Sequence, residues 1–120
     1  MKTNEQINKA RNGVFNNLQK LENYNFKTDK KRNSILGIKP LGRYMIMVEN
    51  IDNIDKFIEI ADKNAELLGV IYYYKIWKKY VWEQNNEIVM SDRCLLDISE
   101  FITKLNKEKL LIKGDGKWKQ

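Results

Sequence analysis

The sequence contains no histidine, and this absence excludes several classes of catalytic site. Imidazole is the commonest general base near neutral pH, the commonest metal ligand, and a member of the usual serine and cysteine triads. A single cysteine, Cys94, cannot form an internal disulfide or build a zinc site without histidine. A disulfide-stapled secreted fold is therefore excluded, and we expect Cys94, which precedes two leucines, to be a small core residue.

Long apolar runs and phosphate-binding glycine loops are also lacking. No apolar stretch approaches the ~20 residues that a membrane-spanning helix needs, and residues 1–8 lack the apolar core of a signal peptide. Gly37, Gly42, Gly114 and Gly116 fit neither nucleotide-binding spacing. We therefore expect a cytoplasmic protein that has no membrane partner and no cofactor.

One group of carboxylates is a candidate for catalysis. Glu49, Asp52, Asp55 and Glu59 lie around a predicted strand end and helix start, where such residues can hold Mg²⁺ for phosphoryl chemistry. The structural interpretation is that Asp52 caps the helix, Asp55 complements its dipole, and Glu59 lies on its solvated face. We favour the structural interpretation, which predicts no metal site and no enzymatic activity.

The residues that are present suit one compact domain with a basic surface. The chain has 120 residues, of which 42% are hydrophobic, and this is enough for a single core over residues 1–120. The net charge is +6. Residues 1–34 carry eight basic and three acidic side chains, whereas residues 35–69 carry four basic and six acidic ones. Such asymmetry favours a nucleic acid or an acidic protein surface as partner.

Three segments have the periodicity of amphipathic helices. Residues 4–24 place an apolar stripe at spacings of three and four and lead into a basic loop that ends at residue 34. Residues 53–68 follow Asp52 as a cap and end at Gly69, where a left-handed terminator is expected. Residues 98–109 follow a capping box formed by Asp97 and Glu100.

The remaining apolar segments predict strands. Residues 35–38 form an expected edge strand ended by Pro40, residues 43–49 a buried strand, and residues 110–113 a final edge strand. Residues 70–83 are rich in β-branched and aromatic side chains and are read as one strand, although helical spacing fits them too. Asn85-Asn86 would turn the chain into a returning strand over residues 87–93, and residues 114–120 would form a loose tail.

Together these elements predict an α+β fold with a mostly antiparallel sheet packed against helices. After the N-terminal helix, the expected order is β-α-β-β-α-(β), which is the order of the ferredoxin-like unit. Two groups of residues are candidates for binding. The first is the basic loop, with Lys27, Lys30, Lys31 and Arg32. The second is one face of the aromatic strand, with Tyr73, Lys75, Trp77 and Lys79.

Each group also has a structural interpretation: the lysines can be a solvated surface, and the aromatic rings can fill the core. The leading hypothesis is a non-enzymatic regulator or inhibitor that binds nucleic acid or a nucleoprotein complex. Its size and composition fit accessory proteins of phages and mobile elements, some of which act as anti-CRISPR proteins. The alternatives are a subunit that forms homo-oligomers through edge strands and a small metal-dependent nuclease.

Overall fold

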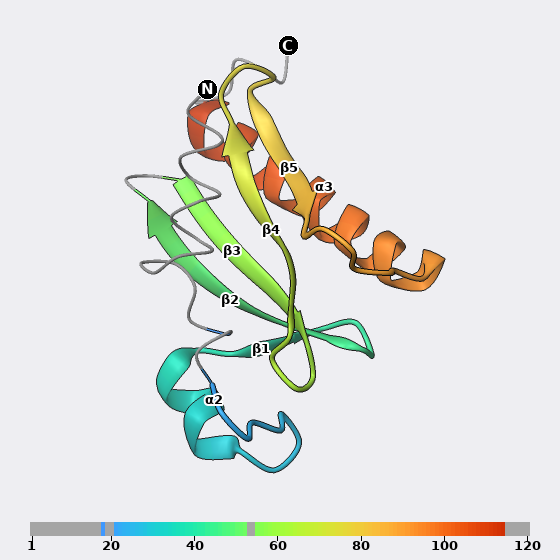
Figure 1. Cartoon of the computed structure of the whole chain (residues 1–120). Helices are drawn as coiled ribbons and strands as arrows, with labels where there is room; N and C mark the ends of the chain where they lie inside the picture. Colours follow the sequence, from blue (N-terminus) through green and yellow to red (C-terminus); the bar gives the residue numbers. More distant parts are fainter. Residues whose placement is uncertain (1–17, 19–20, 53–54, 115–120) are drawn as a thin grey trace.

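The described part of the chain folds as a five-stranded antiparallel sheet with two helices (Figure 1). This computed structural model describes residue 18 and residues 21–52 and 55–114. The elements are α2 (Lys30–Leu36), β1 (Lys39–Leu41), β2 (Met45–Asp52), β3 (Asp55–Asp62), β4 (Leu67–Tyr74), β5 (Lys79–Gln84) and α3 (Asp92–Gly114). The predicted α+β class is confirmed. Most of the helix predicted over residues 4–24 lies outside the described residues, as does the predicted tail beyond residue 114.

The sheet is a meander in which the strands follow one another in sequence order. Each neighbouring pair is antiparallel, and no helix separates consecutive strands from β1 to β5, so the ferredoxin-like order is wrong for the described strands. That order uses crossover helices to join strands that are not neighbours in the sheet, whereas these strands are joined to their neighbours by short connections. Pro40 lies in β1, which is an edge strand of the sheet, a position that tolerates proline because one side of the strand has no neighbouring strand.

The helix predicted over residues 53–68 is also wrong, because its described residues form β3 and the turn into β4. Residues 57–61 are all buried, since the strand is covered on both faces. Such a strand has a continuous apolar run that also satisfies the spacing of a helix. Asp52 therefore ends β2 and caps no helix. The turn is held by Asp62, whose carboxylate accepts hydrogen bonds from the amides of Asn64 (2.8 Å) and Glu66 (3.0 Å).

The single strand predicted over residues 70–83 is a hairpin made of β4 and β5. Tyr74 pairs with Lys79, so the chain reverses at residues 75–78 and not at Asn85-Asn86. Lys78 has a φ of 56°, and its amide donates a 2.8 Å hydrogen bond to the carbonyl of Tyr74, which closes the turn. The returning strand predicted over residues 87–93 is absent, because residues 87–91 are irregular and α3 begins at residue 92.

α3 extends beyond both ends of the helix predicted over residues 98–109 and includes the segment predicted as a final strand. The Ser91 hydroxyl accepts a 3.2 Å hydrogen bond from the amide of Cys94, so the helix is capped there and not at Asp97. A stripe at helical spacing packs on the sheet: Cys94, Ile98, Phe101, Ile102 and Leu105. No helix within the described residues has the length and apolarity to cross a bilayer.

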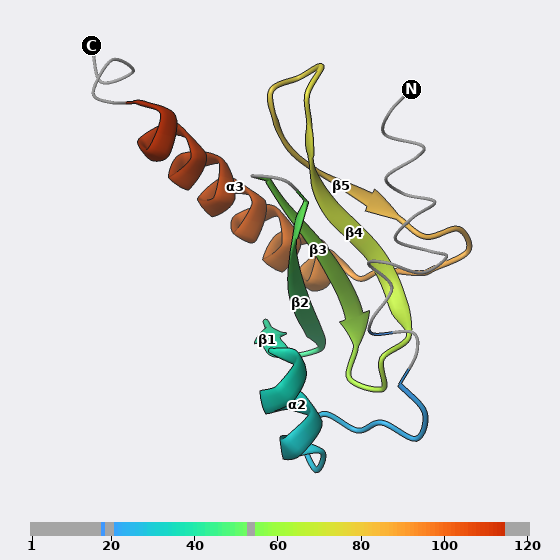
Figure 2. The ribbon, with the colours of Figure 1, turned by 90° about the vertical axis from the view of Figure 1, so that its left-hand side faces the viewer.

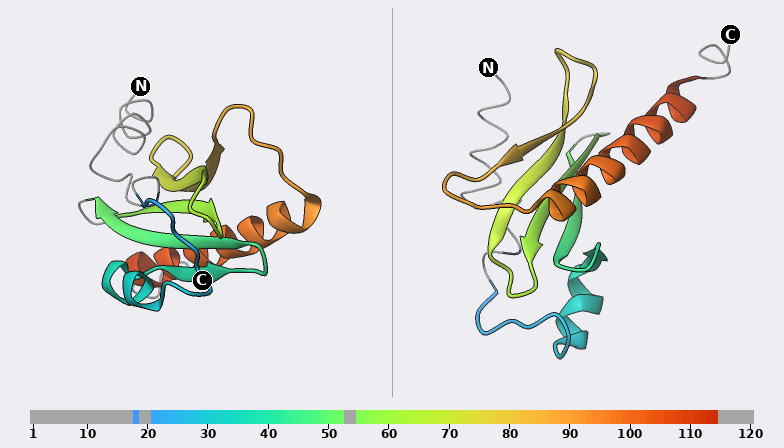
Figure 3. Two further views of the ribbon diagram at one scale, coloured as in Figure 1. Left: turned by 60° about the horizontal axis from the view of Figure 1, so that its bottom comes forward. Right: turned by 90° about the vertical axis from the view of Figure 1, so that its right-hand side faces the viewer.

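Both faces of the sheet are buried, and α3 crosses one of them diagonally (Figures 2 and 3). The α3 face includes the buried residues Met45, Met47, Ile58, Ile60, Ile71 and Tyr80. The opposite face includes Ile46, Val48, Phe57, Ala61, Val70 and Tyr72, with Leu18, Tyr24 and Ile38 packed against part of it. The aromatic segment of residues 70–83 therefore has no fully solvent-exposed face along most of its length.

Candidate functional site

The most exposed part of the aromatic segment is the hairpin tip, which we define as residues 75–79 (Figure 1, top). All five residues are exposed, and Ile76 and Trp77 expose 66% and 64% of their surface. The other three are Lys75, Lys78 and Lys79. Residues 67–82 contain no acidic side chain, so no carboxylate lies next to these lysines in the sequence. The tip therefore combines one exposed indole with three cations.

Ring contacts and hydrogen bonds support the tip from below. The rings of Tyr74 and Trp77 meet edge to face, with centroids 5.1 Å apart. One step further down, Tyr73 and Tyr80 form a second such pair at 5.4 Å. Asn106 of α3 accepts a 2.7 Å hydrogen bond from the amide of Tyr80, which ties β5 to the long helix. The hairpin thus presents Trp77 on a fixed base.

A half-buried ion pair near this base involves a lysine that does not belong to the exposed cations. Lys109 pairs with Asp55 and lies 4.1 Å from the centre of the Tyr73 ring. Burial lowers the pKa of Lys109, but the hydrogen bond and charge of Asp55 outweigh it, so the pKa lies above its usual value. Lys109 therefore anchors α3 to the sheet and stays charged at neutral pH.

The predicted basic loop lies at the other end of the molecule, around α2 (Figures 1 and 2). Lys27, Lys30 and Lys31 are exposed there. Arg32 instead holds the local backbone: its Nε lies 3.3 Å from Asp29, and its Nη1 donates a 2.9 Å hydrogen bond to the carbonyl of Glu22. The structure therefore does not join the two predicted groups into one site.

The aromatic group is partly at the tip and partly in the core. Lys75, Trp77 and Lys79 are exposed, whereas Tyr73 is half-buried on the α3 face. The sequence interpretation missed Ile76 and Lys78, because strict strand alternation assigns them to the opposite face. A turn ends that alternation, so all five residues are exposed together. In the sequence, the signal that could have identified these five residues is the stretch of residues 67–82, which contains lysines but no acidic side chain.

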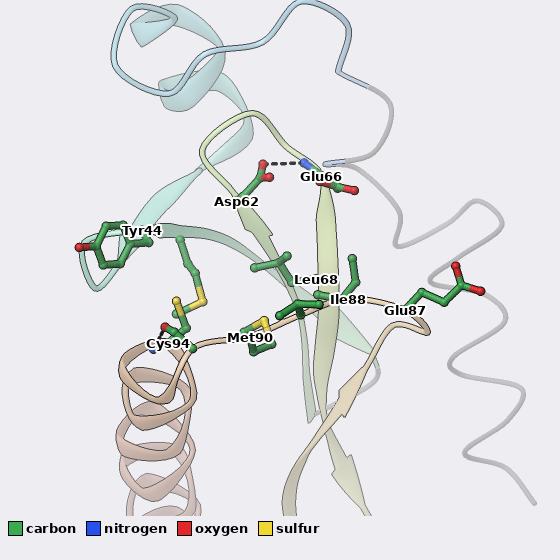
Figure 4. Close-up of a pocket in the computed structure, with 11 residues that line it drawn as sticks. Tyr44, Asp62, Glu66, Leu68, Glu87, Ile88, Met90 and Cys94 are labelled. Carbon is green, nitrogen blue, oxygen red and sulfur yellow. Dashed lines mark hydrogen bonds between the residues drawn. The ribbon is translucent and has the colours of Figure 1, made fainter.

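The second feature is a groove of about 400 Å³ between the β1–β2 turn, the β3–β4 turn and residues 87–91 (Figure 4). Its apolar lining includes Met45, Leu68, Ile88, Met90 and Cys94. Met45 and Leu68 are buried, and the other three are half-buried against the α3-face core. Methionine adapts readily to different occupants, so this floor suits an apolar side chain of variable shape.

The rim of this groove is acidic. Asp62, Glu66 and Glu87 contribute carboxylates, and no lysine or arginine is among its described lining residues. Beyond Tyr44 lies a separate hollow with a different character, lined in part by Arg43 and Arg93. No sequence pattern predicted the groove, because its lining comes from three turns and the first turn of α3 that meet only in the folded chain.

Two of the carboxylates considered for catalysis pair with lysines. Asp55 pairs with Lys109, and Glu49 lies 3.3 Å from the Nζ of Lys56. Glu59 is buried inside the sheet and not on a solvated helix face, which corrects the prediction. Among the described residues, no group of three or more carboxylates and thiols is placed to hold a metal ion.

Comparison with protein-family models, curated proteins and solved structures found no match to this chain.

Proposed function

We propose that this chain is a non-enzymatic binding protein whose hairpin tip contacts nucleic acid at unpaired bases. The observation that carries the proposal is the joint exposure of Trp77 and three lysines on a braced hairpin. Lysines that neutralise phosphates release condensed counterions, which supplies affinity without sequence preference. An indole stacks on a base through its ring face, a contact that any unpaired base can make.

Single-stranded nucleic acid suits the tip better than duplex. Reading of the duplex major groove usually requires a helix or a two-stranded ribbon laid along it. Here the exposed contact is the end of a hairpin, with one ring and one aliphatic side chain at its apex. A protein that binds in this way regulates or inhibits by occupying a strand that another factor needs, whether the strand is free or part of a nucleoprotein complex.

The test compares two variants with equal charge loss at opposite ends of the molecule. The tip variant carries Lys75→Gln, Lys78→Gln and Lys79→Gln, and the control carries Lys27→Gln, Lys30→Gln and Lys31→Gln. Both remove three of the charges that make up the net +6. Binding of a short fluorescein-labelled single strand is followed by fluorescence anisotropy at increasing salt. Each lost phosphate contact lowers the salt slope by about 0.7, so the tip variant should lose about 2.

The proposal requires that the tip variant binds more weakly and with a smaller slope, while the control stays close to the unaltered chain. Equal losses in both variants would assign binding to diffuse charge and overturn the proposal. Absence of binding by the unaltered chain would also overturn it. Vesicles containing anionic lipid form a separate arm: a tip that binds them and not the strand identifies a membrane-surface protein instead.

A further inference from the structure

The hairpin tip and the groove are complementary in both shape and charge. The tip is convex and carries Ile76 and Trp77 among three lysines. The groove is concave, with an apolar floor and three acidic residues, Asp62, Glu66 and Glu87, in its lining, although the Glu87 side chain extends away from the floor (Figure 4). We propose that the groove receives the hairpin tip of a second copy of this chain, with an apolar tip side chain on the floor and lysines at the rim.

The volume of the groove suits such an occupant. At about 400 Å³ it lies within the ~300–1,000 Å³ of pockets that enclose small molecules, so it has room for an indole ring. The apolar floor removes ring surface from water, and the acidic residues of the lining attract the lysines on either side of that ring. Opposite charges around an apolar centre favour one register and reject partners of the wrong sign.

The positions of the two surfaces determine the form of the assembly. The tip is the turn between β4 and β5, whereas the groove adjoins the β3–β4 turn at the opposite end of β4 (Figures 1 and 4). One contact therefore joins two copies head to tail and leaves one tip and one groove available. Such a heterologous contact adds further copies unless the ring closes. The mass should grow past that of a dimer as concentration rises.

The contact is small and its charges are close to solvent, so the association should be weak and salt-sensitive. Interfaces well below ~1,200 Å² belong to transient complexes, and exposed charge pairs are screened within about 10 Å at ~0.1 M salt. Because the same tip carries the proposed nucleic-acid contact, strand binding and self-association would exclude each other. That consequence rests on the proposed function, whereas the self-association itself does not and is measured without nucleic acid.

A charge swap gives the decisive test, read by sedimentation velocity at increasing protein concentration. The tip variant carries Lys75→Glu and Lys78→Glu, and the groove variant carries Glu66→Lys and Glu87→Lys. Each variant alone sets like charges against each other and should remain monomeric. In an equimolar mixture the altered tip can meet the altered groove, and the unaltered tip of the groove variant can meet the unaltered groove of the tip variant. Both pairings bring opposite charges together, so the mixture should associate. Both variants keep a positive net charge, because each swap changes the original +6 by four, so simple attraction cannot explain association.

A matched control separates the tip from general charge effects. Lys30→Glu with Lys31→Glu in α2 makes the same change in net charge at the other end of the molecule but leaves the tip and the groove unaltered, so this variant should self-associate as the unaltered chain does. Adding Trp77→Ala to both the tip variant and the groove variant should abolish association in the mixture. Three results would each overturn the proposal: an unaltered chain that stays monomeric at every concentration, a mixture that fails to associate, or an α2 variant that stays monomeric as the tip variant does.

Discussion

Two tryptophans on one hairpin should respond very differently to truncation. Trp77 is 64% exposed at the tip, whereas the ring of Trp82 on β5 lies against Gly69 of β4, on the face that α3 covers. A tryptophan buries up to about 250 Å² when fully enclosed, so the covered third of Trp77 amounts to roughly 80 Å². At ~25 cal/mol per Å², Trp77→Ala should lower the free energy of unfolding by no more than about 2 kcal/mol.

Trp82→Ala removes a half-buried ring that packs against the α3-face core and opens space beside Gly69. Large-to-small changes of this kind cost about 3–5 kcal/mol when the ring is enclosed. Since 1 kcal/mol corresponds to about 4 °C in a domain of this size, we expect a fall of up to about 8 °C in Tm for Trp77→Ala. For Trp82→Ala, the same conversion gives a fall of at least about 12 °C.

Thermal melts followed by circular dichroism measure both changes, and urea denaturation gives the free energies. The binding assay then separates the two roles. Loss of one stacked base costs about 1–3 kcal/mol, so Trp77→Ala should weaken single-strand binding by roughly 5- to 150-fold while the fold is kept. If Trp77→Ala lowers stability as much as Trp82→Ala, the ring is part of the core and the assignment of the tip as a contact surface is refuted.

Three further predictions concern the framework that supports the tip. Gly69→Ala places a methyl group 2.5 Å from both the Trp82 ring and the Glu83 carbonyl, so urea denaturation should show a loss of about 1–3 kcal/mol. At Gly37 an added methyl group meets open space, but a φ of +67° is strained for alanine, so Gly37→Ala should lower the free energy of unfolding by about 1 kcal/mol. If Gly69→Ala and Gly37→Ala cost the same, the packing explanation for Gly69 is wrong. Asn106→Ala removes the acceptor of the Tyr80 amide, so it should cost about 1–3 kcal/mol and speed hydrogen exchange at that amide; unchanged exchange would refute the role of Asn106. The folded-state pKa of Tyr24 is raised by burial and by Asp29, and that of Lys109 is raised by Asp55 despite burial. The folded chain therefore holds these protons longer than the unfolded chain, and stability should fall as the pH rises above the ordinary values of 10.0 and 10.5. Denaturation at several alkaline pH values should show this fall, and Tyr24→Phe with Lys109→Met should reduce it; an equal fall in the double variant would contradict the assignment.

The sequence predicted some elements because their local signals agree with their final environment. The apolar run at residues 43–49 is a strand buried on both faces, and it became β2 with a shift of a few residues. The stripe through Ile98, Phe101 and Leu105 spans a helix that faces one surface, so its periodicity survives in α3. Pro40 argued against a central strand because it lacks an amide, and it lies in the edge strand β1, but the edge strand expected over residues 35–38 is wrong because α2 extends to residue 36.

Other elements were mispredicted where two-sided burial removed the pattern. In β3 every residue from 57 to 61 is buried, so no polar alternation distinguishes this strand from a helix. The helical pattern places Asp62 on the solvated face of a helix, but its carboxylate accepts hydrogen bonds from two backbone amides of a tight turn. Gly69 reads as a helix terminator, but its missing side chain makes room for the Trp82 ring. In each case the partner that decides the structure comes from another strand or from the far side of a turn.

By itself, the sequence determined the class of fold, the positive net charge and the presence of lysines beside aromatic residues without nearby acids. Tertiary structure decided which rings are available. The two-sided burial of β4 encloses Tyr72, whereas the turn at residues 75–78 leaves Trp77 outside. It also created the acid-rimmed groove from separate turns. Composition determines which chemical groups the chain has, whereas strand pairing determines which of these groups contact one another and which are exposed to solvent.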